Sequence, residues 1–357
     1  MSYLPFAATR TSIHYGFAVG KVRVLETKVF GKTTYERLLD AGTFAEQRRI
    51  LSDTIYGRYL EGAETPAAVE EALSHALDDF YGFLDESHLP AEVVRYFRIR
   101  YDFANLKGAL KARALGIAPE GLFVTLGTVP VEQFSGALDE LPASLGPLAE
   151  RFEAVEADDA AVRQVSRAAD SAEPVSSVAG ATSDAQLARI DFEVDKAMFA
   201  ELTADASKSK SRFLKGLAEL EIDIANLKVL LRARLAGIAP DHFAEMLFDG
   251  GAMTRAELIE LYSLPLADAA ARLARLPVVS GIPVTELMEP GRVDVIADNV
   301  VVRYLRAARA VPVGPEPVIA YVLARVAEVT AVRSILVGTL SGLSSDTLRA
   351  RLRDVYV

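Results

Sequence analysis

An 18-residue segment occurs twice in this chain, with starts 121 residues apart. The first copy, residues 102–119, reads DFANLKGALKARALGIAP, and the second, residues 223–240, reads DIANLKVLLRARLAGIAP; 12 of the 18 positions are identical without a gap. A weaker third copy, residues 328–345, begins 105 residues further on and reads EVTAVRSILVGTLSGLSS. Helical solenoids repeat every 20–50 residues or so, so the longer period indicates repeated units of domain size.

Three such units fit a chain of 357 residues, which is long for one ordinary domain. We predict helical repeat domains at residues 1–126, 127–245 and 246–357, the second of which includes the Ala/Ser/Asp-rich segment 154–186. Proline-containing breaks at 127–147 and 277–291 support more than one packed unit. Three similar units can be arranged about a pseudo-threefold axis, which would leave a central opening or depression.

The repeated segment has the apolar spacing of a helix that packs on one side. Phe103, Leu106, Leu110 and Ala114 share one face of the first copy, and the second copy places Ile224, Leu227, Leu231 and Leu235 in the same way. We expect this face to be core. Glycines at 116 and 237, each followed three residues later by proline, predict the end of each helix.

The same apolar spacing recurs in residues 69–84. Thr65-Pro66, just before this segment, is the expected cap and first turn of its helix. Strand-like alternation is rare, and its best candidate, residues 277–284, is short and interrupted by Gly281 and Pro283. The sequence therefore predicts an all-α fold.

Polar side chains repeat beside the apolar stripe. Asp102 with Asn105, and Asp223 with Asn226, form i, i+3 pairs for which a capping or register-fixing role against a neighbouring helix is favoured over a ligand contact. A second set is basic, and either a solvated face, the favoured interpretation, or a partner-binding surface would explain it. Its members are Arg100, Lys107 and Lys111 at the first copy, Lys228 and Arg232 in the second copy and, at the matching position of the third copy, Arg333.

Composition narrows the class of protein. With 39 Lys and Arg against 49 Asp and Glu the net charge is −10, which disfavours nucleic acid and a mainly electrostatic attachment to anionic lipid, although a local basic patch remains compatible with it. The chain has no cysteine, and no secretory signal or membrane span is recognisable. We expect a cytoplasmic protein that meets the membrane only through partners.

No catalytic, cofactor-binding or metal-binding residue is predicted. Residues 30–33 read Phe-Gly-Lys-Thr, but a phosphate-binding loop also needs a glycine five positions before Gly31, where this chain has Glu26. We expect Gly31 to separate two helices instead. The four histidines are scattered and form no metal-binding helical pattern, and no Gly-x-Ser-x-Gly elbow occurs.

Motifs spread over nearly the whole chain resemble one family. They are residues 15–23 (YGFAVGKVR) with Glu26, residues 51–56 (LSDTIY), the Asp-x-x-Asn-Leu-Lys core at 102–107 and 223–228, residues 314–321 (GPEPVIAY), Glu328, Arg333, and the terminal 352–357 (LRDVYV). Together they resemble the family of C subunits of bacterial and archaeal V-type ATP synthases, which is related to the d subunit of eukaryotic vacuolar ATPases. Two departures are segment 154–186 and the closing motif, usually Lys-Glu-x-Glu-x-x-Asn, which is Arg325–Ala331 here.

The resemblance implies a funnel of three helical domains whose opening receives the tip of a central shaft, made of the D and F subunits. The other side of the funnel would sit on the membrane proteolipid ring. Such a protein has no catalytic site and no cofactor, and as a central-stalk rotor part it transmits torque for coupled ATP turnover and ion transport. The alternative is a helical scaffold or adaptor unrelated to rotary motors.

Overall fold

The computed structural model describes residues 14–119, 121–136, 138–152, 176–273 and 293–357, and within them it contains helices and no strand. The predicted all-α class is confirmed. The chain divides into two compact units, residues 1–91 with 209–357, and residues 92–208. The division at 1–126, 127–245 and 246–357 stays a prediction.

The larger unit is built from both ends of the chain. Its N-terminal helices are α1 (His14–Glu26), α2 (Lys32–Asp40), α3 (Phe44–Ser52), α4 (Gly57–Leu60) and α5 (Pro66–Glu86). Its C-terminal helices are α10 (Arg212–Leu235), α11 (Pro240–Glu245), α12 (Arg255–Ser263), α13 (Leu266–Leu273), α15 (Val293–Arg306), η3 (Ala307–Ala310), α16 (Pro315–Leu340) and α17 (Ser345–Arg351).

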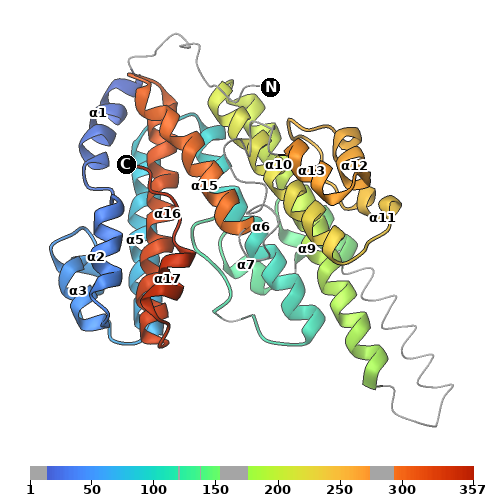
Figure 1. The fold of residues 1–357 in the computed structure, drawn as a ribbon, viewed down its shortest axis with the longest axis horizontal. Helices are drawn as coiled ribbons and strands as arrows, with labels where there is room; N and C mark the ends of the chain where they lie inside the picture. The colour runs from blue at the N-terminus through green and yellow to red at the C-terminus, as the bar shows by residue number, and fades with distance from the viewer. Residues whose placement is uncertain (1–13, 120, 137, 153–175, 274–292) are drawn as a thin grey trace. The chain divides into compact units, whose positions relative to one another are not determined.

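Helices α5 and α16 lie side by side and form the centre of this unit (Figure 1). Thr65 caps α5 by accepting a hydrogen bond from the Ala68 amide, and Pro66 occupies the first turn, as predicted. The apolar stripe of α5, including Leu73, Leu77 and Leu84, is buried. Helix α16 buries apolar residues around most of its circumference in its first half, which makes it the central helix of the unit.

Both ends of the described chain meet at α1. Helix α1 packs against α16, and the predicted break at Gly31 is confirmed, because residue 31 is the extended N-cap of α2. The last residues return to this region, where the Tyr356 hydroxyl donates a hydrogen bond of 2.6 Å to Oε1 of Glu26. A buried contact therefore joins two residues 330 positions apart.

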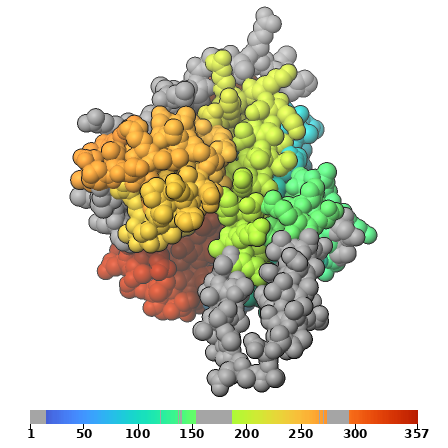
Figure 2. All heavy atoms as spheres, turned by 90° about the vertical axis from the view of Figure 1, so that its right-hand side faces the viewer, coloured from blue at the N-terminus to red at the C-terminus, as the bar shows by residue number. Residues whose placement is uncertain are grey.

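Helix α10 packs on α12 and α15, and α11 packs on α12. Figure 2 shows α11, α12 and α13, coloured yellow to orange, as one close-packed block. The cap of α12 is a complete capping box, in which the Thr254 side chain accepts from the Glu257 amide and the Glu257 side chain accepts from the Thr254 amide. This block is the segment that follows the second repeat helix.

The smaller unit contains most of α6 (Ala91–Leu115), followed by α7 (Glu132–Ser135), η1 (Leu138–Glu140) and α9 (Ser176–Lys208). Arg95 on α6 contacts both Glu201 and Asp205 of α9, at 2.6 and 2.5 Å. The predicted linker 154–186 falls largely outside the described residues, and its last part begins α9. Residues 277–291, with the strand candidate 277–284, also lie outside them.

The three repeat helices, α6, α10 and α16, end in the same way. Gly116, Gly237 and Gly342 have φ of 64°, 66° and 78°, a left-handed conformation that glycine adopts without strain. In each, the residue after the glycine donates its amide to a carbonyl five positions back, as in Ile117 to Ala112. This is the Schellman motif, so the predicted helix ends at Gly116 and Gly237 are confirmed.

One part of the predicted core is wrong. Leu235 is 74% exposed, and Ile224 and Leu231 are only partly buried. The buried face of α10 instead contains Asp223, Asn226 and, among apolar residues, Ile222, Leu227, Leu230 and Ala233. The face is rotated because the chain that follows α10 folds back over the polar pair, which the apolar spacing alone does not reveal.

Candidate functional site

The polar pair of α6 holds the loop that follows this helix. Oδ1 of Asp102 accepts hydrogen bonds from the amides of Thr128 and Val129 at 2.8 and 3.0 Å, and Oδ2 accepts one from the Thr128 hydroxyl at 2.5 Å. The Asn105 amide group both donates to the carbonyl and accepts from the amide of Val124, each at 2.9 Å. We call this set, Asp102 and Asn105 with residues 124–129, the first clasp.

Helix α10 repeats this arrangement. Oδ1 of Asp223 accepts from the Met253 amide at 3.0 Å, while Asn226 pairs with both backbone groups of Phe248 at 2.9 and 2.8 Å. This second clasp contains Asp223 and Asn226 with residues 248–253. All four side chains of the two polar pairs are at most 1% exposed, and each forms a hydrogen bond with the backbone inside its own unit.

Each clasp requires a glycine. A Cβ atom added at Gly127 would lie 2.1 Å from Oδ1 of Asp102, and one added at Gly251 would lie 2.1 Å from Oδ1 of Asp223. The returning backbone therefore approaches each carboxylate more closely than any other residue allows. Burial raises the pKa of the Asp102 carboxyl, and the hydrogen bonds from Thr128 and Val129 oppose that shift.

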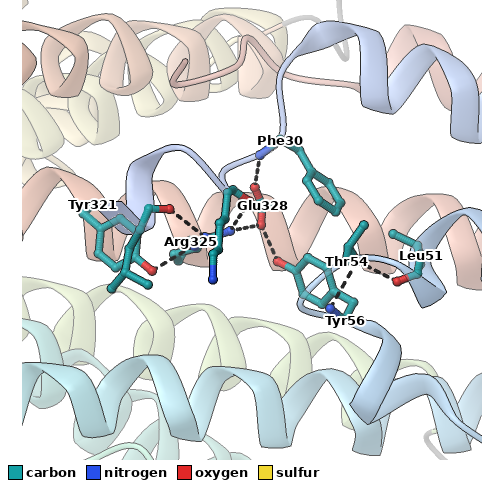
Figure 3. A network of polar contacts seen from close by, with 9 residues as sticks. Phe30, Leu51, Thr54, Tyr56, Tyr321, Arg325 and Glu328 are labelled. Atoms are coloured by element: carbon teal, nitrogen blue, oxygen red, sulfur yellow. Dashed lines mark hydrogen bonds and ion pairs between the residues drawn. The ribbon is translucent and has the colours of Figure 1, made fainter. Parts of the chain in front are cut away.

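The third repeat helix, α16, has Glu328 at the position of Asp102 and Ala331 at the position of Asn105. Glu328 accepts hydrogen bonds from the Phe30 amide at 2.5 Å and the Tyr56 hydroxyl at 2.7 Å, and it forms an ion pair with Arg325 at 2.5 Å (Figure 3). The Glu328 and Arg325 side chains are each 1% exposed. Burial raises the pKa of Glu328, and the charge of Arg325 opposes that shift.

Arg325 completes this third clasp, defined as Arg325 and Glu328 with residues 25–56. Its guanidinium donates to the carbonyls of Leu25 and Lys28 at 3.1 and 3.2 Å, which belong to the last turn of α1 and the turn after it. The Phe30 amide is bound to Glu328, so the Phe-Gly-Lys-Thr segment is part of the clasp.

The repeated basic residues reach acidic residues on a neighbouring helix. Lys107 and Lys111 of α6 contact Asp195 and Asp191 of α9, each at 2.6 Å. Lys228 of α10 contacts Asp294 of α15 at 2.8 Å, with Arg232 at 4.0 Å from the same carboxylate. Arg333 of α16 contacts Glu70 of α5 at 2.7 Å.

These ion pairs follow one rule along the chain. In all three, the residue at the Lys107 position contacts the last α-helix before another repeat helix: α9 before α10, α15 before α16 with only η3 between them, and α5 before α6. The cations are partly exposed, at 24% for Lys107, 26% for Lys228 and 33% for Arg333. Each repeat helix is thus tied to the helix that leads into the next repeat, and the third is tied to the helix that leads into the first.

Several residues that make these contacts, or others with the returning chain, are hard to find by a motif search. Tyr56 lies in a segment that the family resemblance covers, but nothing in its spacing links it to Glu328. Arg325 stands three positions before Glu328 on α16, and this i, i+3 spacing is the available signal for their pairing. Arg113 and Arg234 occupy one position of the repeat and donate to carbonyls of the returning chain, at Gly136 and at Leu261, respectively. Their identity in both copies is the available signal.

Within the described part of the chain, no group of three or more His, Asp or Glu side chains is placed to hold a metal ion. No described helix is long and apolar enough to cross a membrane. On each of the three repeat helices, buried polar side chains hold another segment of the chain, and a partly exposed cation pairs with an acid on a second helix.

Comparison with known proteins gives one consistent family. The sequence model of the ATP synthase (C/AC39) subunit family matches residues 18–351. The C subunit of the A-type ATP synthase of Methanocaldococcus jannaschii is 22% identical over 95% of this chain and 86% of its own length, and that of Methanosarcina mazei is 24% identical over 96% and 93%. The C subunit of the V-type ATP synthase of Thermus thermophilus is 26% identical over 64% of this chain and 66% of its own. With a family match from the first helix to the last, this chain belongs to the ATP synthase (C/AC39) subunit family.

Proposed function

We propose that this chain is the non-catalytic central-stalk component of an A-type or V-type ATP synthase, cytoplasmic and bound to the membrane through the complex. In this role it receives the tip of the shaft made of the D and F subunits and rests on the membrane proteolipid ring. It transmits torque between ATP turnover in the soluble head and ion transport in the membrane. The observation that carries the proposal is the family match over residues 18–351.

The internal organisation suits a part that must transmit force. Repeat helices that are each tied by a buried clasp, and by an ion pair to the helix before another repeat, resist shear better than helices joined by loops alone. The buried third clasp adds a tie between segments near the two ends of the chain. Three similar units arranged as a funnel around the shaft fit this function.

Co-purification tests the proposal. An affinity-tagged copy of the chain, expressed in place of the untagged one, is expected to bring down the shaft and ring subunits after mild detergent extraction. Recovery of the chain without either would refute the central-stalk role and favour a helical scaffold unrelated to rotary motors. Recovery with the ring alone or the shaft alone would show that only half of the connector role is correct.

A rotation assay tests torque transmission itself. In a complex assembled with this chain, ATP hydrolysis is expected to drive rotation of a bead attached to the proteolipid ring. Rotation of the ring in a complex assembled without the chain would show that another component makes the connection.

A further inference from the structure

Helix α1 leaves one face uncovered. Phe17 is 76% exposed and Val24 is 63% exposed, and the two lie seven residues apart on the same side of the helix. Lys21 lies between them on this side, and Lys28 follows in the turn after the helix. The opposite side, with Ala18, Val19 and Val22, is buried in the larger unit.

Gly20 lies on this face and Gly16 lies at its edge, and the packing of the described residues does not require a glycine at either position. A Cβ atom at Gly16 or Gly20 would meet nothing within 4 Å, so alanine would fit at either position. Glycine inside a helix is unfavourable relative to alanine. The absence of a Cβ atom at Gly20, three residues from Phe17, allows the backbone of another helix to come close.

Charge distinguishes the kind of partner. Among the described residues, no acid lies within ion-pair distance of Lys28 or Lys32, and both are exposed. Lys21 contacts Glu86 at 2.8 Å, but that carboxylate is itself 70% exposed. In a chain of net charge −10, this local excess of positive charge faces outward and is complementary to an acidic surface.

We propose that the α1 face formed by Phe17, Gly20 and Val24, with Lys28 at its end, docks an acidic α-helix of another component of the complex. The inference rests on the proposed function, which supplies the complex. Within α1, the line from residue 17 to residue 24 is about 10 Å long, at roughly 1.5 Å per residue. A helix with apolar or small residues on one side and Asp or Glu at i, i+3 or i+4 spacing matches it along its length.

Photo-crosslinking in the assembled complex tests this contact. The photoreactive residue p-benzoylphenylalanine is placed at position 17, where 76% exposure makes a folding defect unexpected, and at Leu235 as a matched control of 74% exposure on another helix. The expected product joins position 17 to a helical segment of another component that contains spaced acidic residues. The control is expected not to reach that segment.

A second measurement uses charge. Reversal of both exposed lysines, Lys28→Glu with Lys32→Glu, is expected to lower recovery of the chain in the complex about tenfold. The same reversal at Lys208 and Lys210, which changes net charge equally, is expected to leave recovery unchanged. Acid-to-lysine changes in the cross-linked helix should restore recovery of the first variant, which loss of folding would not permit.

The outcomes separate the two proposals. A cross-link from position 17 to lipid, to the chain itself, or to nothing, in a chain that still purifies with the complex, overturns the docking face and leaves the central-stalk role standing. Equal loss of recovery for both charge-reversed pairs also overturns it. A chain that never enters the complex removes the proposed function and the docking face together.

Discussion

Helices α6 and α10 hold the chain that follows them, whereas α16 holds the beginning of the chain. Asn105 binds a residue 19 positions later and Asn226 one 22 positions later, but Glu328 binds Phe30 across 298 positions. The acidic residue of α16 is satisfied by the Phe30 amide and the Tyr56 hydroxyl, which belong to the N-terminal part of the larger unit. Closure of such a long loop costs more chain entropy, although the cost grows only slowly with length.

The three clasps differ in their chemical groups as well as in the sequence separation that they join. In the first two clasps a carboxylate and a neutral amide satisfy backbone groups of a nearby loop. In the third, a buried arginine balances the carboxylate, and the hydroxyl of Tyr56 replaces one of the backbone donors. We therefore expect local, graded losses when the first two are broken and a larger, less local loss when the third is broken.

The largest effect is expected at Glu328. The change Glu328→Gln leaves the Arg325 charge buried without a counter-charge, and loss of one partner of a buried pair typically costs about 3–5 kcal/mol. Urea denaturation of the full chain, followed by circular dichroism, measures this loss in the free energy of unfolding. A loss below that of the first-clasp variants would contradict the contrast between the repeats.

A double variant separates charge from packing at the same place. Arg325→Met with Glu328→Leu removes both charges, and we expect it to recover most of the lost stability, because apolar replacement of a buried pair is often neutral. The Tyr56 hydroxyl and the Phe30 amide lose their acceptor in this variant, so recovery is expected to be incomplete. The same urea titration measures it, and a double variant no more stable than Glu328→Gln would show that packing, not charge, dominates the third clasp.

The next effect concerns the two close approaches of backbone to carboxylate. Gly127→Ala and Gly251→Ala each place a Cβ atom 2.1 Å from an aspartate oxygen, so the aspartate must move and its hydrogen bonds weaken. We expect each to cost about 3 kcal/mol in the free energy of unfolding, at the upper end for overpacking. Gly108→Ala is the matched control, since its nearest neighbour would be 3.9 Å away and α6 gains helix propensity.

Loss of an asparagine should cost somewhat less. Asn105→Ala and Asn226→Ala each leave one amide and one carbonyl of the returning loop without a partner, for an expected cost of about 2 kcal/mol. The reverse change, Ala331→Asn in α16, is expected to be within about 0.5 kcal/mol of neutral, because the third clasp does not use that position. Thermal unfolding of the three variants side by side checks this, and a gain in stability with Ala331→Asn would show that α16 retains the local clasp.

The sequence predicts the helices of the repeats well and their contacts less well. Gly116 and Gly237 end their helices as expected, because a glycine followed by proline dictates the turn locally. The placement of Leu235 in the core is wrong, since its burial depends on where the next segment lies and not on the spacing of apolar residues. The partners Asp195, Asp294 and Glu70 come from other helices, and no pattern within the repeat points to them.

The contacts of the two polar pairs could be predicted only in part. The i, i+3 spacing of Asp102 and Asn105 favours a capping or register-fixing role against a helix, and the structure places the pair against a loop of its own repeat. Tyr56 cannot be found from spacing, because its contact with Glu328 exists only after residues 272 positions apart have come together. The spacing of polar residues in one helix thus indicates that they contact another segment of the same repeat. It gives no indication of a contact between segments far apart in the sequence, such as that of Tyr56 with Glu328.

The smallest effect is expected at the ion pairs between helices, where the first and second repeats should behave alike. Hydrogen bonding from Lys228 lowers the pKa of Asp294 below its ordinary value, so the carboxylate form is favoured in the folded state. Stability from this pair is then present above the unfolded pKa, about 3.9, and is lost as the pH falls through the folded pKa. Because Asp294 is half-exposed, we expect Lys228→Met to cost only about 0.5 kcal/mol at pH 7, and urea titrations should show a smaller cost at pH 2.

A charge swap then tests whether Lys107 and Lys228 only stabilise the fold or also bind a partner. Reversal of both Lys107 and Lys228 to Glu is expected to weaken assembly with a partner more than it lowers the melting temperature. Adding Asp195→Lys and Asp294→Lys re-forms both pairs with opposite polarity, so the melting temperature should return while assembly stays weak. If assembly recovers together with the melting temperature, both lysines act only through their ion pairs with α9 and α15. The first two repeats and the third would then differ in their clasps, and the two lysines would not bind a partner.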